Sequence, residues 1–163
     1  GGEAGVTVRV LHLLGSPALR VPGVAVTAVD DEVREFIEDL YQTMDAASGI
    51  GLAANQVGIP RRVCVVRASL FKDPEPGMTV GSARVFVDPS IDLREGDIVS
   101  TEMCLSMPGA RVNVNRASRV VVSYVGKDGV RSSVDVTGDP AVVLQHEIDH
   151  LDGIMMVDRV GRL

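Results

Sequence analysis

The chain has 163 residues, is 45% hydrophobic and 23% charged, and carries a formal net charge of −6 at pH 7. This balance is typical of a globular protein and excludes a disordered one, and the length predicts a single domain over residues 1–163. The acidic balance, without any lysine- or arginine-rich run, argues against a nucleic-acid partner. No apolar run approaches the roughly 18 residues of a membrane span.

The two cysteines, Cys64 and Cys104, are too few for the disulfide framework of a secreted domain. No charged-then-apolar signal peptide opens the chain. We therefore expect a cytoplasmic protein, or an organellar one if a transit peptide has been removed. Cys64 lies in the apolar run 62–68 and is expected to be a buried thiol.

The first predicted element is a helix over residues 31–47, where apolar residues recur at helical spacing. Asp30 or Asp31 is its expected N-cap. A glycine-containing loop is predicted at 48–58.

Strands are predicted at 62–68 and 83–89, and the Pro-, Gly- and charge-rich segment 70–82 between them predicts a surface loop. Segments 119–125 and 130–136 flank a Gly-Lys-Asp-Gly turn and predict a β-hairpin. An antiparallel hairpin argues against a wound parallel sheet, so the expected fold class is α+β.

A second helix is predicted over 140–151, with Asp139 as N-cap, proline at the first helical position and Gly153 as the stop. It carries His146 and His150, whose four-residue spacing puts both imidazoles on one face. Two such rings chelate a metal, and the adjacent glutamate fits a general base. The third histidine of the chain, His12, lies in an apolar stretch and is expected to be structural.

The apolar neighbours of the histidine pair predict a largely buried helix, where unpartnered polar side chains are costly. A bound metal would remove that cost, but a catalytic site of this type needs a third protein ligand. Cys104 is an upstream candidate, because a thiolate suits a borderline divalent metal; its alternative is a second buried thiol. A different HExxH peptidase would need another third ligand, and neither Asp152 nor Asp158 has the usual spacing.

Three segments occur in a fixed order: GIGLAANQ (49–56), EMCLS (102–106) and QHEIDHLDG (145–153). Together they resemble the peptide deformylase family. The resemblance implies an α+β fold in which antiparallel strands pack around a central metal-bearing helix. It also implies N-formylmethionyl peptides and nascent chains as partners, with proximity to the ribosome, and we expect a monomer.

The implied cofactor is one divalent metal ion per chain, iron(II) in the cell, with zinc, nickel or cobalt as replacements on isolation. The implied reaction hydrolyses the N-formyl group from the N-terminal formyl-methionine of newly made polypeptides and releases formate. Glu147 would move the proton, and the Gln56 side-chain amide and the Leu105 N–H would stabilise the oxyanion. The implied metal ligands are Cys104, His146 and His150.

In this interpretation Gly49 and Gly51 let the substrate backbone approach as an added strand, between segments 49–51 and 103–106. The same glycines match a G-x-G-x-x-A dinucleotide fingerprint, but a helix rather than a strand precedes them, which argues against nucleotide binding. The substrate's methionine side chain also needs an apolar pocket. The candidate residues for this pocket could instead serve only in core packing. These candidates are Ile50, Val142 and Val143.

Further residues are assigned by the resemblance alone. Asp149 should pair with Arg116 and fix the helix behind the ligands. Arg111 corresponds to a family arginine near the substrate entrance, or else is a solvated surface charge.

The sequence departs from the family pattern at Met103, where glycine is usual, and at Ser48, where many members have an acidic residue. Met103 adjoins Cys104 and borders the expected peptide groove. We interpret the chain as a retained deformylase with altered ligand fit. The alternatives are a protein that only binds formylated peptides and an enzyme for another N-formyl compound.

Overall fold

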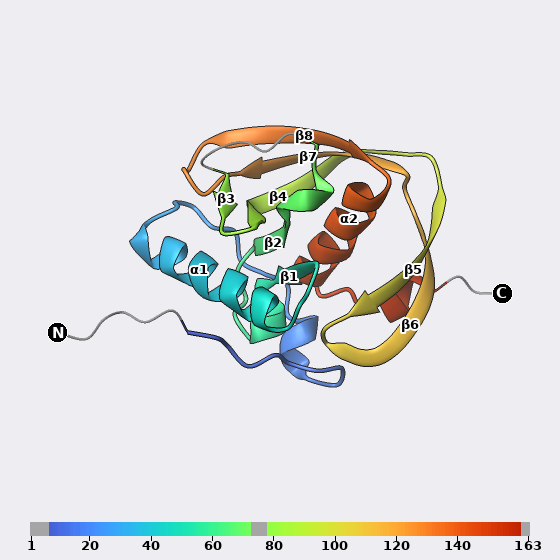
Figure 1. Ribbon diagram of the computed structural model, residues 1–163, viewed down its shortest axis with the longest axis horizontal. Helices are drawn as coiled ribbons and strands as arrows, with labels where there is room; N and C mark the ends of the chain where they lie inside the picture. The colour runs from blue at the N-terminus through green and yellow to red at the C-terminus, as the bar shows by residue number, and fades with distance from the viewer. Residues whose placement is uncertain (1–6, 73–77, 161–163) are drawn as a thin grey trace.

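The computed structural model describes residues 7–72 and 78–160 (Figure 1). Two α-helices and four short 3₁₀ turns are present within these residues. The α-helices are α1 (Asp31–Ala46) and α2 (Asp139–Leu151). The 3₁₀ turns are η1 (Pro17–Arg20), η2 (Ala54–Val57), η3 (Ala68–Leu70) and η4 (Met156–Arg159).

The strands form two antiparallel sheets. A larger sheet has the order β1-β2-β4-β7-β8, with β3 paired to β4, and a separate sheet pairs β5 with β6. The strands of the larger sheet are β1 (Gly51–Ala53), β2 (Val63–Arg67), β3 (Thr79–Val80), β4 (Ala83–Glu95), β7 (Arg119–Val125) and β8 (Arg131–Thr137). The second sheet consists of β5 (Ile98–Cys104) and β6 (Met107–Arg116).

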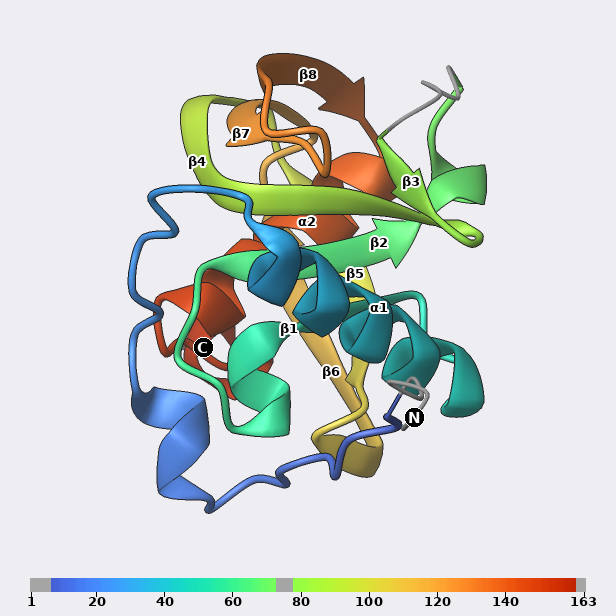
Figure 2. The ribbon, with the colours of Figure 1, turned by 90° about the vertical axis from the view of Figure 1, so that its left-hand side faces the viewer.

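The two α-helices cover opposite faces of β1 and β2 (Figures 1 and 2). Successive side chains of a strand point to opposite faces, and β2 shows the result. Val63 and Val65 belong to the apolar cluster that includes α1, whereas Cys64 and Val66 belong to the cluster that includes α2. The α+β class and the central position of the histidine helix are therefore confirmed, as is the burial of Cys64.

Helix α1 follows its sequence pattern closely. The Asp30 side chain accepts a hydrogen bond from the Val33 N–H and so caps the helix. Its buried apolar side chains recur every three or four residues, which gives one face toward the sheet. These side chains are Val33, Phe36, Ile37, Leu40 and Met44.

Helix α2 is covered by protein on more than one side. The larger sheet covers one side, and the second sheet lies along the side that the larger sheet leaves open (Figure 1). Its residues from Ala141 to Leu151 are buried except Val143. The predicted cap is wrong by one position. The N-cap is Gly138 at φ 73°, a conformation that glycine adopts without strain, and Asp139 is already helical.

Three other boundaries differ from prediction. The predicted loop 48–58 contains β1 and η2, because Leu52 and the residues after it are buried against the sheet. The strand expected at 83–89 continues to Glu95, where β4 pairs with β7. The expected surface loop 70–82 has buried ends at Phe71, Met78 and Val80, and its segment 73–77 lies outside the described residues.

The sheet of β5 and β6 was not predicted. It buries few apolar side chains: Cys104 and Val114 form a small cluster with Met156 of η4, whereas Val99 and Met103 of β5 are exposed. The predicted hairpin of β7 and β8 is confirmed. No helix among the described residues is long and apolar enough to cross a membrane.

Candidate metal centre

The thiol and the two imidazoles singled out in the sequence meet at one point. Cys104 ends β5, and His146 and His150 lie one turn apart on α2. The His150 Nε2 atom lies 3.3 Å from the Cys104 sulfur and 3.2 Å from His146 Nε2. The three candidate ligand atoms all lie within 4.8 Å of one another, and all three residues are buried.

This donor set fits a divalent metal ion. Two ring nitrogens and a sulfur converge in the buried interior, and a shared proton satisfies only one pair of them at a time. Burial lowers the pKa of His150 well below its ordinary value, so the ring is neutral, the form that binds metals. A single cation between the three atoms would satisfy all of them, and a Cys/His/His set is one that catalytic zinc-type sites use.

Glu102 orients the first of these rings. One oxygen of its carboxylate lies 2.8 Å from His146 Nδ1. If this nitrogen donates to the carboxylate, the lone pair of Nε2 is left facing Cys104 and His150. Burial acts to raise the pKa of Glu102, but hydrogen bonds from Arg116 and His146 outweigh it and hold that pKa at about 2. Glu102 is therefore an anion at neutral pH.

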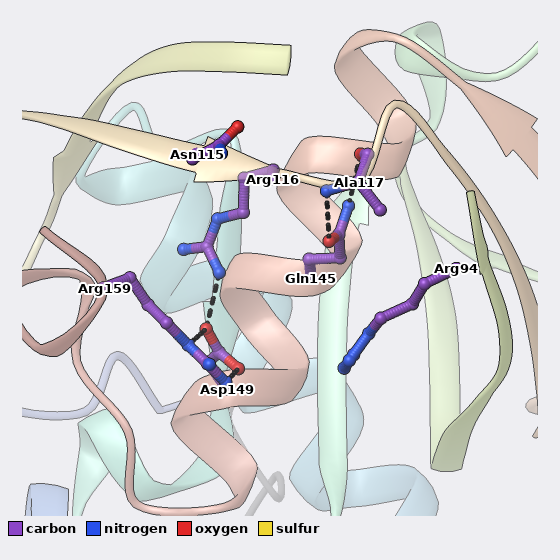
Figure 3. A pocket seen from close by; sticks show the side chains of 7 residues that line it. All are labelled: Arg94, Asn115, Arg116, Ala117, Gln145, Asp149 and Arg159. Carbon is purple, nitrogen blue, oxygen red and sulfur yellow. Dashed lines mark hydrogen bonds and ion pairs between the residues drawn. The ribbon is translucent and has the colours of Figure 1, made fainter. Parts of the chain in front are cut away.

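Behind Glu102 lies a chain of buried ion pairs. Arg116 donates to both Glu102 oxygens at 2.8 Å and to Asp149 Oδ2 at 2.5 Å. Asp149 also accepts from Arg159 Nη2 at 2.9 Å (Figure 3). The pairing of Arg116 with Asp149, expected from the resemblance, is thus present. The Arg116 guanidinium joins β6 to β5 and α2, and the Asp149 carboxylate extends the chain to η4. Removing one partner from such a set leaves a costly unpaired charge.

Glu147 points into the same space but has no fixed partner for its second oxygen. Its Oε1 lies 4.0 Å from His146 Nε2, and among the described residues its Oε2 has no hydrogen-bond partner. Burial raises the pKa of Glu147 to about 7. A carboxyl group with a free oxygen and a pKa near neutrality is suited to accept and return a proton.

The glycines of the first motif make room for neighbouring side chains. A Cβ on Gly51 would lie 3.0 Å from Glu147 Oε1, and a Cβ on Gly49 would lie 2.8 Å from Leu105 Cδ1. Glycine therefore allows Glu147 to approach the start of β1, and Leu105 to approach the backbone just before it. The dinucleotide alternative fails here, because α1 precedes these glycines and the strand follows them.

Gln56 is held in one orientation beside Cys104. Its Oε1 accepts from the Ala53 N–H at 2.9 Å, so its amide nitrogen points the other way. That nitrogen donates to Ser106 Oγ at 3.1 Å and lies 3.6 Å from the Cys104 sulfur. Leu105 follows Cys104 in the turn between β5 and β6, so its N–H adjoins the same centre.

The other candidate substrate residues divide into exposed and buried ones. The side chains of Ile50 and Met103 are 54% and 64% exposed, and Arg111 is exposed on β6. Val142 is buried one turn before His146, whereas Val143 is half-buried and packs against the α2 cluster. Val142 and Val143 both stay candidates for the methionine pocket.

Sequence reasoning missed several residues around the centre. Glu102 and Ser106 both lie within the EMCLS motif, where they went unassigned beside Cys104. Asn55 lies within the first motif and donates to the His150 carbonyl oxygen, which fixes the end of α2. No local sequence pattern singles out Arg159, because only the folded chain brings it next to its partner Asp149.

A buried Cys/His/His set beside a free carboxyl group defines the class of metal-dependent hydrolases. The family model for polypeptide deformylase matches residues 8–163. A peptide deformylase of Agrobacterium fabrum is 40% identical over 160 residues, which cover 97% of this chain and 90% of the relative. The chain belongs to the peptide deformylase family.

Solved structures agree in fold. A peptide deformylase from Synechococcus elongatus in complex with actinonin has a TM-score of 0.86 and 38% identity, covering 98% of this chain and 84% of its own. A class I type b peptide deformylase from Acinetobacter baumannii with bound Met-Ala-Ser has a TM-score of 0.84 and 31% identity, covering 96% and 100%. The family is metal-dependent and acts on formylated peptides.

Proposed function

We propose that the chain removes the N-formyl group from the formyl-methionine of newly made polypeptides, releasing formate, with Glu147 as the proton carrier. The observation that carries this proposal is the free Oε2 of Glu147, buried beside the converging Cys104, His146 and His150 side chains. A protein that only binds peptides has no need of this group.

Cys104, His146 and His150 would hold one divalent ion per chain. When bound, the metal polarises the formyl carbonyl and lowers the pKa of water. A mixed sulfur and nitrogen set suits iron(II), zinc, nickel and cobalt, and we assign iron(II) to the cell. Glu102 keeps His146 in the orientation that this binding needs.

The proton path uses Glu147 alone. Its pKa of about 7 lets it take the proton of the attacking water and return it to the departing amine at neutral pH. Gly51 leaves the space in which this carboxyl group lies. In our proposal Gly51 is therefore needed by the base as well as by the substrate backbone.

Two donors would stabilise the oxyanion that forms on the carbonyl oxygen when water attacks the formyl carbon. The Gln56 amide is already oriented, because the Ala53 N–H holds its oxygen. The Leu105 N–H adjoins Cys104 in the turn. A preorganised donor of this kind costs no rearrangement when charge develops, and losing one typically lowers the rate about 10²–10³-fold.

The peptide would bind as an added strand between segments 49–51 and 103–106. Ile50, Val142 and Val143 contact the methionine side chain in this proposal. Met103 borders the groove, and Arg111 lies near the entrance. The Met-Ala-Ser peptide bound to the Acinetobacter relative supports this substrate class. We also propose that the chain acts as a cytoplasmic monomer near the ribosome.

The test measures formate release from formyl-Met-Ala-Ser after anaerobic loading with iron(II) or nickel(II). Glu147→Ala should keep one metal ion per chain but release formate about 10²–10⁴-fold more slowly. Glu35→Ala, on the exposed face of α1, is the control and should match the wild type. No release by the metal-loaded wild type would favour a binding role or another N-formyl substrate.

A further inference from the structure

A second concave site lies on the side of α2 next to the metal ligands, and we call it the arginine pocket. It encloses about 160 Å³, several times the space that one water molecule needs. Its polar lining comes from β4, β6, α2 and η4 (Figure 3). The residues that matter here are Arg94, Asn115, Arg116, Gln145, Asp149 and Arg159.

The pocket holds more positive charge than its acids neutralise. Three arginines line it, of which Arg116 and Arg159 pair with Asp149, and Glu102 pairs with Arg116 from the other side. Three cations against two carboxylates leave a local surplus of one positive charge in a chain whose net charge is −6. A surplus of this kind attracts an anion, all the more where the walls are partly desolvated.

The surplus resides on Arg94. Neither an ion pair nor a hydrogen bond joins its side chain to any residue in the described part of the chain, so all five of its N–H donors are free. Figure 3 shows Arg94 approaching from the side opposite Arg159, whose Nε and Nη2 already bind Asp149. Both guanidinium groups therefore line the pocket, and each keeps N–H donors that no described residue accepts from.

The wall between them is rigid. Gln145 accepts from the Ala117 N–H at 3.1 Å and donates to the Ala117 carbonyl oxygen at 2.9 Å, so both ends of its amide are occupied. Arg116 is buried and is held by Glu102 and Asp149. The pocket keeps its shape because these side chains have no freedom to fill it.

We propose that the arginine pocket binds a phosphate group, held between Arg94 and Arg159. The planar fork of each guanidinium matches two oxygens of a tetrahedral oxyanion, and such charge-assisted pairs are about twice as strong as neutral ones. The pocket is linked to the metal ligands through Arg116, which lines it and also binds Glu102, the partner of His146. This inference does not depend on the deformylase reaction.

The experiment titrates the zinc-loaded protein with inorganic phosphate and follows the backbone amide signals of Ala117 and Gln145 by NMR. We expect these signals to shift saturably, and Arg94→Gln to weaken binding at least about fivefold. Arg131→Gln, an exposed arginine at the start of β8, makes the same charge change away from the pocket and should leave the affinity unchanged.

Two further ligands define the class of anion. Uridine 5′-monophosphate binding more tightly than inorganic phosphate would mean that the group belongs to a nucleotide, and equal affinities would mean free phosphate; both support the proposal. Acetate binding as tightly as phosphate would overturn it. So would unshifted Ala117 and Gln145 signals, or equal affinity in Arg94→Gln and Arg131→Gln.

Discussion

The contact of α1 with the larger sheet and the contact of α2 with the second sheet are built by different physical means. On the α1 side, contact is made by apolar side chains such as Ile37, Leu40 and Leu52, all fully buried. On the outer side of α2, contact with β5 and β6 is made by ion pairs and hydrogen bonds of Glu102, Arg116 and the helix. Apolar contact is non-directional, whereas a metal centre needs ligands fixed in direction.

This difference teaches where the fold tolerates change. Substitutions on the α1 side should destabilise the fold in proportion to the side-chain volume removed. They should leave the metal centre intact. The α2 side should respond to the loss of single polar groups, because one arginine, Arg116, binds both Glu102 and Asp149. The following changes test that contrast.

The largest effect is expected for Arg116→Met. The change leaves Glu102 without its arginine partner and removes one of the two arginines that bind Asp149. Removing one partner of a buried ion pair typically costs about 3–5 kcal/mol of folding stability. Urea unfolding in excess chelator measures this cost without any contribution from metal binding. A loss below about 1 kcal/mol would mean that the network does not hold the sheets together.

Leu40→Ala should cost about 2–5 kcal/mol, because it opens a cavity on the fully buried face of α1. Its expected metal content is one ion per chain, as in the wild type. Elemental analysis beside urea unfolding measures both quantities. Loss of metal together with stability would show that the two sides are not independent.

Glu102→Gln should act on the metal more than on the fold. The amide lacks the charge that holds the His146 ring, and loss of such an outer partner typically weakens metal affinity about 10–100-fold. Competition with a chelator of known affinity measures the change. Glu35→Gln, an exposed residue of α1, is the matched control, and equal affinities in the two variants would refute the role of Glu102.

The smallest effect on stability is expected for Met103→Gly, within about 1 kcal/mol, because this side chain is 64% exposed. Its effect should fall on substrate and inhibitor binding, as a several-fold change in KM for formyl-Met-Ala-Ser and in hydroxamate affinity. Steady-state kinetics and inhibitor titration test this. Unchanged values in both would mean that Met103 does not shape the groove.

Much of the α1 side was predictable from local pattern. Helical spacing and the Asp30 cap define α1, and alternation defines β2 and the hairpin of β7 and β8. The ligand cysteine and histidines were also accessible, because short motifs carry their spacing. Local sequence patterns predict structure correctly where each residue's role depends on its neighbours in the sequence.

The α2 side was less predictable, because its contacts link distant segments. Glu102 and His146 are far apart in the chain, and no local rule pairs them. The strands β5 and β6 escaped prediction because they bury few apolar side chains. The N-cap shift to Gly138 arose from the same limitation: Asp139 fits a cap by type, but the positive φ that starts the helix requires the glycine before it.

The central claim is that Cys104, His146 and His150 bind one metal ion together, oriented by Glu102. X-ray absorption spectroscopy of the zinc-loaded protein tests it most directly. The account predicts one sulfur ligand at about 2.3 Å and two imidazole nitrogens at about 2.0–2.1 Å, with the sulfur lost in Cys104→Ser. A zinc spectrum without sulfur in the wild type, or one unchanged in Cys104→Ser, would contradict it.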